Sequence, residues 1–272
     1  MTISFDYWLN WYATTYCNLK CEFCLIKDEG HFDCNPKIDH LKLLKTLSSF
    51  NKPFLITFSG GEPFLIPNIV ESMKEVAKEH FISINTNLIC DNIKEFVKEV
   101  NPNKVRDIFA AFHIKELVKH NLIEKYINNF NLCRNAGFNI KASAVAYPPL
   151  LPQANKSREL LKKQNINLEF DPFFGEFNGK EYPKSYTDEE MKVFQMDESK
   201  KEKFYHFEKM CNAGKNAGMV FPDGTVFACS GVCIKIGNVY EKIVFKDNLI
   251  KCPNKKCGCP FYLYEPELFK KA

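Results

Sequence analysis

The stretch Thr15-Tyr16-Cys17-Asn18-Leu19-Lys20-Cys21-Glu22-Phe23-Cys24 places three cysteines in a Cys-x3-Cys-x2-Cys pattern. An extended aromatic stretch from Phe5 to Ala13 comes directly before it and predicts a strand that leads into a loop. Thiolates hold iron-sulfur clusters, and a cubane normally takes four of them, so a loop with three leaves one iron without a protein ligand. Because an open coordination position is where a metal centre does chemistry, we expect this loop to form the active site and the rest of the chain to be built around it.

Zinc binding and disulfide formation also use closely spaced thiols. A zinc knuckle would need a fourth ligand, and His31, Cys34 and His40 are close enough in the sequence to supply one. Disulfides are not expected, because no hydrophobic signal segment precedes the cysteines. The spacing favours an iron-sulfur loop over zinc.

The composition indicates a globular protein of one or two domains. The chain has 272 residues, of which 45% are hydrophobic, and a formal net charge of only +4. Neither the charge nor any basic block implies a nucleic-acid or membrane-surface partner, and no apolar run reaches the length of a membrane span. We therefore expect a cytoplasmic protein without nucleic-acid or membrane partners. Nine of its 12 cysteines cluster near the two ends, which points to metal binding, whereas Cys34, Cys90 and Cys133 lie apart.

After the cysteine loop, helical and strand patterns alternate. The apolar pattern predicts further strands at residues 54–58, 81–86, 105–112, 140–146 and 167–173, with a helix before each of them. One of these helices is expected to run as a single long element through Leu117 and Cys133, and another to cover residues 157–164. Six strands alternating with helices imply parallel pairing in an open, partial (β/α)6 barrel. In such folds the loops at the carboxyl ends of the strands carry the chemistry.

A second motif follows the second predicted strand, at Gly60-Gly61-Glu62-Pro63. Two glycines remove side chains where a ligand must approach the backbone, Glu62 supplies a carboxylate for a cationic amino group, and Pro63 stiffens the exit. A Gly-Gly pair after a strand is by itself an ordinary turn signal. The motif follows the second predicted strand and the cysteine loop follows the first, so we expect the two to lie side by side at the same edge of the sheet. This position favours a binding role.

In these two motifs the chain resembles the radical S-adenosylmethionine (SAM) superfamily, over about residues 5 to 180. The resemblance implies a 4Fe-4S cluster on Cys17, Cys21 and Cys24, with SAM chelating the open iron. It also implies that the Gly60-Gly61-Glu62-Pro63 loop holds the methionyl amino group and that Phe23 lies near the adenine. Thr86 and Asn87 resemble the start of the family's Thr-Asn-Gly turn, but Leu88 replaces the glycine.

The resemblance also implies a reaction. An electron, delivered by a donor such as flavodoxin or ferredoxin, cleaves SAM reductively to a 5'-deoxyadenosyl radical, which abstracts hydrogen from a substrate in the barrel. The cofactor does the difficult chemistry, while the protein positions the substrate and excludes competing reactions.

The C-terminal part carries a second group of thiols. Asp223-Gly224 predicts a hairpin, with Cys211 before it and Cys229 at its end. This pattern resembles the start of a SPASM domain or its shortened Twitch form and implies one auxiliary 4Fe-4S cluster. Two more ligands are expected from Cys252, Cys257 and Cys259, among which the sequence does not choose; Cys233 is a weaker candidate, and a zinc ribbon would use four such thiols equally well.

These observations predict a radical SAM core at residues 1–182, a helical linker at 183–210 and an auxiliary iron-sulfur domain at 211–272. The first functional hypothesis is an oxidoreductase acting on a small sugar- or cyclitol-like molecule, in which the auxiliary cluster takes up an electron. The second is a peptide maturase forming a crosslink or epimer; the short stretch before Cys17 leaves no room for a leader-binding domain there. The third is a non-catalytic zinc- or cluster-binding protein.

Some polar residues near the predicted strand ends could face the cavity. A structural or solvent-facing role is the better interpretation for each, so we assign none as catalytic. They are His113, Lys141, Tyr147, Asp171 and Glu176.

Overall fold

Six parallel strands form the centre of the protein. The computed structural model describes residues 3–28, 36–202, 205–259 and 261. The six strands are β1 Tyr7–Thr14, β2 Phe54–Gly60, β3 Phe81–Thr86, β4 Val105–Ala111, β5 Ile140–Ala146 and β6 Leu168–Pro172. They pair in sequence order and in parallel. The expected α/β fold with a parallel, open sheet is confirmed, and all six strands lie where the sequence predicts them.

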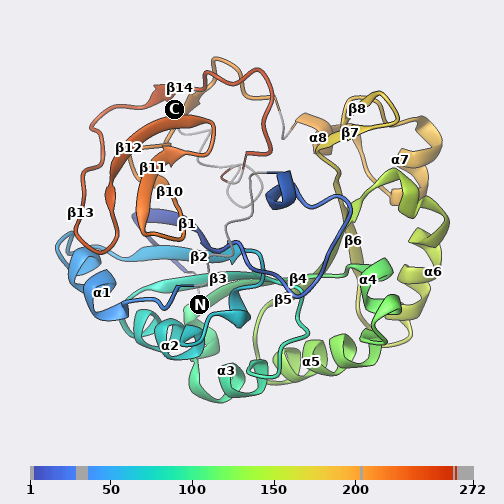
Figure 1. Ribbon diagram of the computed structural model, residues 1–272, viewed down its shortest axis with the longest axis horizontal. Helices are drawn as coiled ribbons and strands as arrows, with labels where there is room; N and C mark the ends of the chain where they lie inside the picture. The colour runs from blue at the N-terminus through green and yellow to red at the C-terminus, as the bar shows by residue number, and fades with distance from the viewer. Residues whose placement is uncertain (1–2, 29–35, 203–204, 260, 262–272) are drawn as a thin grey trace.

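Helices cover the outer face of this curved sheet (Figure 1). They are α1 His40–Ser48, α2 Ile69–Glu79, α3 Ile93–Glu99, α4 Ile114–Lys119, α5 Ile123–Asn135 and α6 Leu151–Lys162. Apolar side chains of the helices, such as Leu43, Met73 and Phe96, are fully buried against the outward side chains of the strands, such as Ile56 and Phe58. Because strand side chains alternate between faces, the remaining residues of each strand point into the barrel.

Two helix predictions were wrong. The single helix expected through Leu117 and Cys133 is two helices, because α4 ends at Lys119 and Asn121 adopts a left-handed conformation with φ +55°. The apolar spacing continues across this break, which hides it from a pattern search. The helix expected from residue 157 begins at Leu151, because Pro152 occupies its first turn, where proline is tolerated.

The C-terminal strands extend the barrel sheet. They are β9 Met210–Cys211, β10 Ala217–Val220, β11 Thr225–Cys229, β12 Val232–Asn238, β13 Lys242–Ile243 and β14 Ile250–Lys251. The predicted hairpin is confirmed: β10 and β11 pair antiparallel around Gly224, whose φ is +81°. Strand β10 also pairs in parallel with β1, so the sheet runs in the order β13-β12-β11-β10-β1-β2-β3-β4-β5-β6 (Figure 1).

Between the barrel and this C-terminal part lie a short hairpin and two helices. Strands β7 Gly175–Phe177 and β8 Lys180–Tyr182 pair antiparallel around Asn178-Gly179. This Asn-Gly turn is a hairpin signal present in the sequence that we did not use. Helices α7 Asp188–Phe194 and α8 Glu198–Glu202 follow, within the segment expected to be a helical linker.

Candidate active site

The cysteine loop leaves the barrel directly after β1. The register between β1 and β2 shifts between Tyr12 and Thr14, and such an irregularity re-aims the chain at the end of a strand. The side chains of Cys17, Cys21 and Cys24 are all partly exposed. The loop is held locally by the Thr14 hydroxyl, which accepts a hydrogen bond from the Tyr16 N–H at 3.0 Å.

The three thiols lie within electrostatic reach of one another. Burial raises the pKa of Cys17 to about 11, and the charges of Glu62 and Cys24 add to the rise. Burial likewise raises the pKa of Cys21 to about 12, and the charges of Cys17 and Cys24 make the next largest contributions to this rise. Grouped thiolates of this kind repel one another, and positively charged iron removes the repulsion. The donor set therefore fits an iron-sulfur cluster.

The glycine loop packs directly on the backbone of the cysteine loop. The Gly61 N–H donates to the Thr14 carbonyl at 2.7 Å, and the Glu62 N–H donates to the Tyr16 carbonyl at 2.9 Å. A Cβ atom on Gly60 would overlap the Thr14 oxygen, and one on Gly61 would overlap the Tyr16 oxygen. The two glycines therefore permit contact between the motifs themselves, in addition to lining the cavity.

The Glu62 carboxylate is fully buried and connects the ends of β2 and β3. Its oxygens accept hydrogen bonds from the Thr86 hydroxyl at 2.8 Å, the Asn87 N–H at 2.7 Å and the Phe64 N–H at 3.0 Å. Burial raises the pKa of Glu62 to about 7, and the three donors act against that rise. We predicted this carboxylate as a partner for a cationic amino group; the structure gives both of its oxygens partners within the chain. Pro63, also buried, begins the short turn that follows.

The substitution Glu62→Gln is expected to destabilise the protein by about 1–3 kcal/mol, because one carboxylate oxygen becomes an NH2 group facing a buried donor. Urea unfolding at pH 7 measures the change. The matched variant Glu95→Gln, on an exposed position of α3, should unfold like the wild type. Equal stability of the two variants would contradict the connecting role of Glu62.

The turn after β3 touches the cysteine loop. The Asn87 amide donates to the Asn18 side-chain oxygen at 2.7 Å and lies 3.9 Å from the Cys17 sulfur. Leu88 has φ +62°, the conformation in which glycine would be favoured, and its side chain is buried. Leu88 therefore adopts a backbone conformation that a glycine at this position would also favour.

A cavity of about 410 Å³ lies inside the barrel, between the strands and the cysteine loop. Its polar lining residues include the predicted candidates His113 and Asp171, together with Asn10, Tyr12, Ser59, Asn85, Thr86 and Ser143. Cys24, Gly60, Gly61 and Gly258 also line it, so both sequence motifs and the C-terminal cysteine segment border the same space. The small polar residues at alternate strand positions were a sequence signal for this lining that we did not use.

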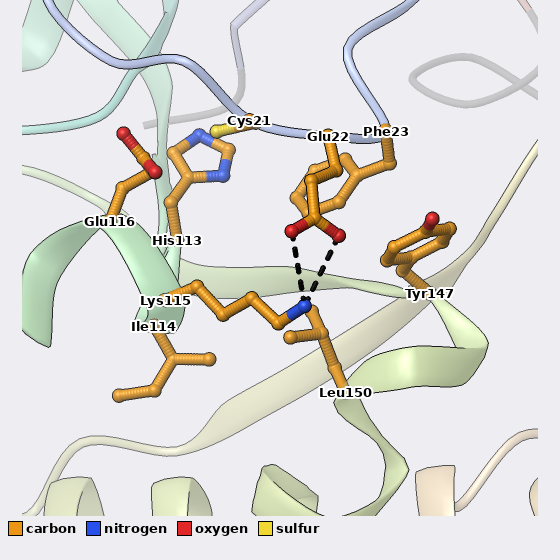
Figure 2. A pocket seen from close by; sticks show the side chains of 9 residues that line it. All are labelled: Cys21, Glu22, Phe23, His113, Ile114, Lys115, Glu116, Tyr147 and Leu150. Carbon is orange, nitrogen blue, oxygen red and sulfur yellow. Dashed lines mark hydrogen bonds and ion pairs between the residues drawn. The ribbon is translucent and has the colours of Figure 1, made fainter. Parts of the chain in front are cut away.

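Phe23 belongs to an aromatic group beside the loop. Its ring centroid lies 5.8 Å from that of His113 and 5.4 Å from that of Tyr147. Figure 2 shows these rings with Cys21 around a small pocket that residues of α4 also line. Burial lowers the pKa of His113 to about 4, and its buried Nδ1 has no hydrogen-bond partner among the described residues. A neutral imidazole with an unused polar atom beside the cavity fits a site for a hydrogen-bonding ligand.

The other polar candidates lie in different surroundings. Asp171 lines the cavity. Lys141 is exposed and forms an ion pair with Asp107 at 3.3 Å. Glu176 is exposed on β7. Neither Lys141 nor Glu176 lines the central cavity in the described part of the chain.

Five C-terminal thiols come together beside the cavity. Pairing of β9 with β14 brings Cys211 next to Ile250, near Cys252. Burial raises the pKa of Cys211 to about 11, and the charges of Cys252 and Cys257 contribute. Burial raises the pKa of Cys229 to about 12, and the charges of Cys211 and Cys257 add to the rise. A hydrogen bond with Cys259 lowers the pKa of Cys257 to about 7.

This thiol group packs on the inner face of the barrel. Cys211 and Cys259 share a buried cluster with Trp8 and Leu55, which belong to β1 and β2. Cys233 is exposed on β12 and does not belong to that cluster. Its position leaves the other five thiols as the candidate ligands.

Among the described residues, no three or more His, Cys, Asp or Glu side chains are grouped closely enough to hold a metal ion. His31 and Cys34, considered above as zinc ligands, lie outside the described residues. A cubane differs from a single ion because each of its thiolates binds a different iron. Over the same described residues, no helix is long and apolar enough to cross a membrane.

The chain is similar to several known proteins. It is 26% identical over 196 residues to a GTP 3',8-cyclase of Clostridium perfringens, a match covering 65% of this chain and 58% of the cyclase, less than two thirds of that relative. The structure of native anSMEcpe with bound AdoMet matches with a TM-score of 0.63 and 18% identity, over 86% of this chain and 78% of that one. Streptococcus suis SuiB bound to precursor peptide SuiA matches with a TM-score of 0.57 and 16% identity, over 88% and 64%.

The family model described as the radical SAM superfamily matches residues 11–161, which include the cysteine loop, the glycine loop and the chain from the end of β1 to nearly the end of α6. This match extends over more than half of the chain. Together with the parallel barrel and the contact between the two motifs, it shows that the chain belongs to the radical SAM superfamily.

Proposed function

We propose that Cys17, Cys21 and Cys24 bind a 4Fe-4S cluster and that SAM binds its open iron at the mouth of the barrel cavity. The observation that carries this proposal is the direct backbone contact between the cysteine loop and the glycine loop, both of which border the cavity. The superfamily's cluster and SAM supply, when bound, a 5'-deoxyadenosyl radical that abstracts hydrogen.

The chain's own residues hold the SAM in this proposal. Gly60 and Gly61 line the cavity and bind the methionyl group through their backbone, while Glu62 keeps their loop in place. Thr86 and Asn87 hold the turn that borders the same site. Phe23, with Tyr147 and His113 beside it, provides an aromatic surface for the adenine ring.

We also propose that the C-terminal part is a Twitch-like auxiliary domain with one 4Fe-4S cluster. Cys211 and Cys229 supply two ligands and two of Cys252, Cys257 and Cys259 supply the others; the mutual effects of these thiols on one another's pKa support this assignment. Gly258 lines the cavity from within this segment, so the auxiliary cluster would lie next to the substrate. Although β10 continues the barrel sheet, residues 1–182, 183–210 and 211–272 remain our proposed core, linker and auxiliary domain.

The iron content tests the auxiliary cluster. Anaerobically purified wild-type protein should contain about eight iron atoms and eight sulfides per chain, as expected for two cubanes. The variant Cys211→Ala should lose about half of both, because a cubane normally takes four thiolates and Cys211 is near Cys229, Cys252 and Cys257. It should still form 5'-deoxyadenosine from SAM and a reductant.

Cys233→Ala is the matched control, because this thiol is exposed and lies apart from the group. Its iron and sulfide content should equal that of the wild type. Zinc without sulfide in the wild-type protein would refute both clusters and favour the zinc alternative.

For the substrate we propose a small, sugar- or cyclitol-like molecule that undergoes net two-electron oxidation. The auxiliary cluster accepts one of the two electrons. A flavodoxin- or ferredoxin-like protein is the external redox partner. The sequence similarity to the GTP 3',8-cyclases supports a small-molecule substrate. A peptide substrate is the second candidate, because structures of similar fold bind peptides.

Deuterium transfer to 5'-deoxyadenosine separates the two candidates. With a deuterated sugar or cyclitol substrate, label should appear in 5'-deoxyadenosine if the small-molecule proposal is right. Transfer of label from a deuterated peptide, and none from the small molecules, would favour the maturase instead.

A further inference from the structure

Helix α4 contacts the cysteine loop from outside the two sequence motifs. The Glu116 carboxylate accepts a hydrogen bond from the backbone N–H of Lys20 at 3.0 Å, across 96 positions of sequence. Glu116 is only 8% exposed, and Figure 2 shows it on α4 beside Cys21. Lys20 directly precedes Cys21, so the contact holds the loop at the backbone between two candidate ligands.

A second contact joins the same helix to the loop but is weaker. Lys115 forms an ion pair with Glu22 at 3.1 Å, and both side chains are more than two fifths exposed (Figure 2). Exposed pairs of this kind contribute little stability. A hydrogen bond to a buried charged acceptor is stronger, which makes Glu116 the principal contact.

The charge of Glu116 also acts on the loop. It contributes to the raised pKa of Cys21, after burial and the charges of Cys17 and Cys24. The basic side chains near it are Lys119 at 3.8 Å and His120 at 3.7 Å, whose side chains are 63% and 45% exposed. Solvent therefore screens those partners, whereas Glu116 faces the loop from a buried position.

We propose that Glu116 is a positioning residue for the SAM-binding cluster, which sets the conformation of the cysteine loop and keeps the cluster's reduction potential low. This inference rests on the proposed function, because it requires a cluster on Cys17, Cys21 and Cys24. A carboxylate beside the cluster disfavours the more negative, reduced state. It also takes up the Lys20 N–H, which would otherwise be available to a cluster sulfur, and hydrogen bonds to sulfur are among the factors that set the potential.

Two substitutions separate the conformational role from the charge. In Glu116→Ala the Lys20 N–H loses its acceptor, so iron should be released to a chelator faster than in the wild type, by roughly the ten- to hundredfold factor that loss of a contact supporting a ligand costs in metal affinity. In Glu116→Gln an oxygen still accepts a hydrogen bond from the Lys20 N–H, so iron should be retained. The negative charge is lost, so the reduction potential of the cluster should shift to a more positive value. Electron paramagnetic resonance during a redox titration measures this potential.

The variants Glu124→Ala and Glu124→Gln are the matched controls, because Glu124 is an exposed acid at the start of α5. Both should keep the wild-type iron-release rate and potential. Should Glu116→Ala fail to fold, the potential of Glu116→Gln decides the inference. Wild-type behaviour of Glu116→Ala in iron release, or an unchanged potential in Glu116→Gln, would overturn it. A wild-type protein without any cluster would instead refute the proposed function.

Discussion

Replacing Cys21 by alanine should abolish formation of 5'-deoxyadenosine from SAM and reductant, and should remove about four iron atoms per chain. The thiol lies in the middle of the three-cysteine loop, where burial and its two neighbouring thiols raise its pKa to about 12. Without it two thiolates remain, which leave a cubane with two unsupported irons. Iron and sulfide analysis and chromatography of the reaction mixture measure the two effects.

Cys133→Ala provides the control for this experiment. Cys133 is a buried thiol in α5, on the outer side of the sheet and away from the loop. Its replacement should reduce thermal stability slightly and leave iron content and SAM cleavage unchanged. Full reductive cleavage by Cys21→Ala would refute the assignment of the cluster to this loop.

Replacing Gly61 by alanine should have the next largest effect, a loss of about 2–4 kcal/mol in the free energy of unfolding together with loss of SAM cleavage. The new Cβ would overlap the carbonyl oxygen of Tyr16, which is backbone and has little freedom to move. Separating the loops also breaks the hydrogen bonds from Gly61 to Thr14 and from Glu62 to Tyr16. Chemical unfolding and 5'-deoxyadenosine formation measure the two losses.

Gly137→Ala is the matched substitution for comparison. A Cβ at Gly137 would meet no atom within 4 Å, and its cost is limited to the left-handed backbone at φ +87°. That cost is about 1–2 kcal/mol, with SAM cleavage unchanged. If Gly61→Ala retained wild-type cleavage, the close contact between the two loops would not be needed for function.

Local patterns predicted most of the fold. Strand β3 has the bounds expected from its apolar residues, and β5 does as well, because burial of alternate side chains leaves its period in the sequence. The break between α4 and α5 was missed because it depends on one residue, Asn121, whose left-handed conformation interrupts a continuing apolar pattern. The pairing of β10 with β1 was also missed, since no local signal marks which distant strand a hairpin joins.

The candidate site likewise has parts that the sequence predicted and parts that it did not. The spacing of Cys17, Cys21 and Cys24 and the Gly60-Gly61 pair are visible in the chain because each motif lies within a few residues. Glu116 carries no such signal, because its partner Lys20 is 96 positions away and the contact exists only once β4 places α4 beside the loop.

The sequence by itself determined the alternation of strands and helices, the three-thiol loop and the presence of a second thiol group, because these follow from residue type and short-range spacing. The tertiary structure alone decided that the Glu62 carboxylate bonds to Thr86 and Asn87 and that four C-terminal thiols, Cys211, Cys229, Cys257 and Cys259, pack into one cluster with the first two barrel strands. The physical reason is that such contacts depend on which strands pair and in what register, and pairing between distant strands leaves no local pattern in the chain.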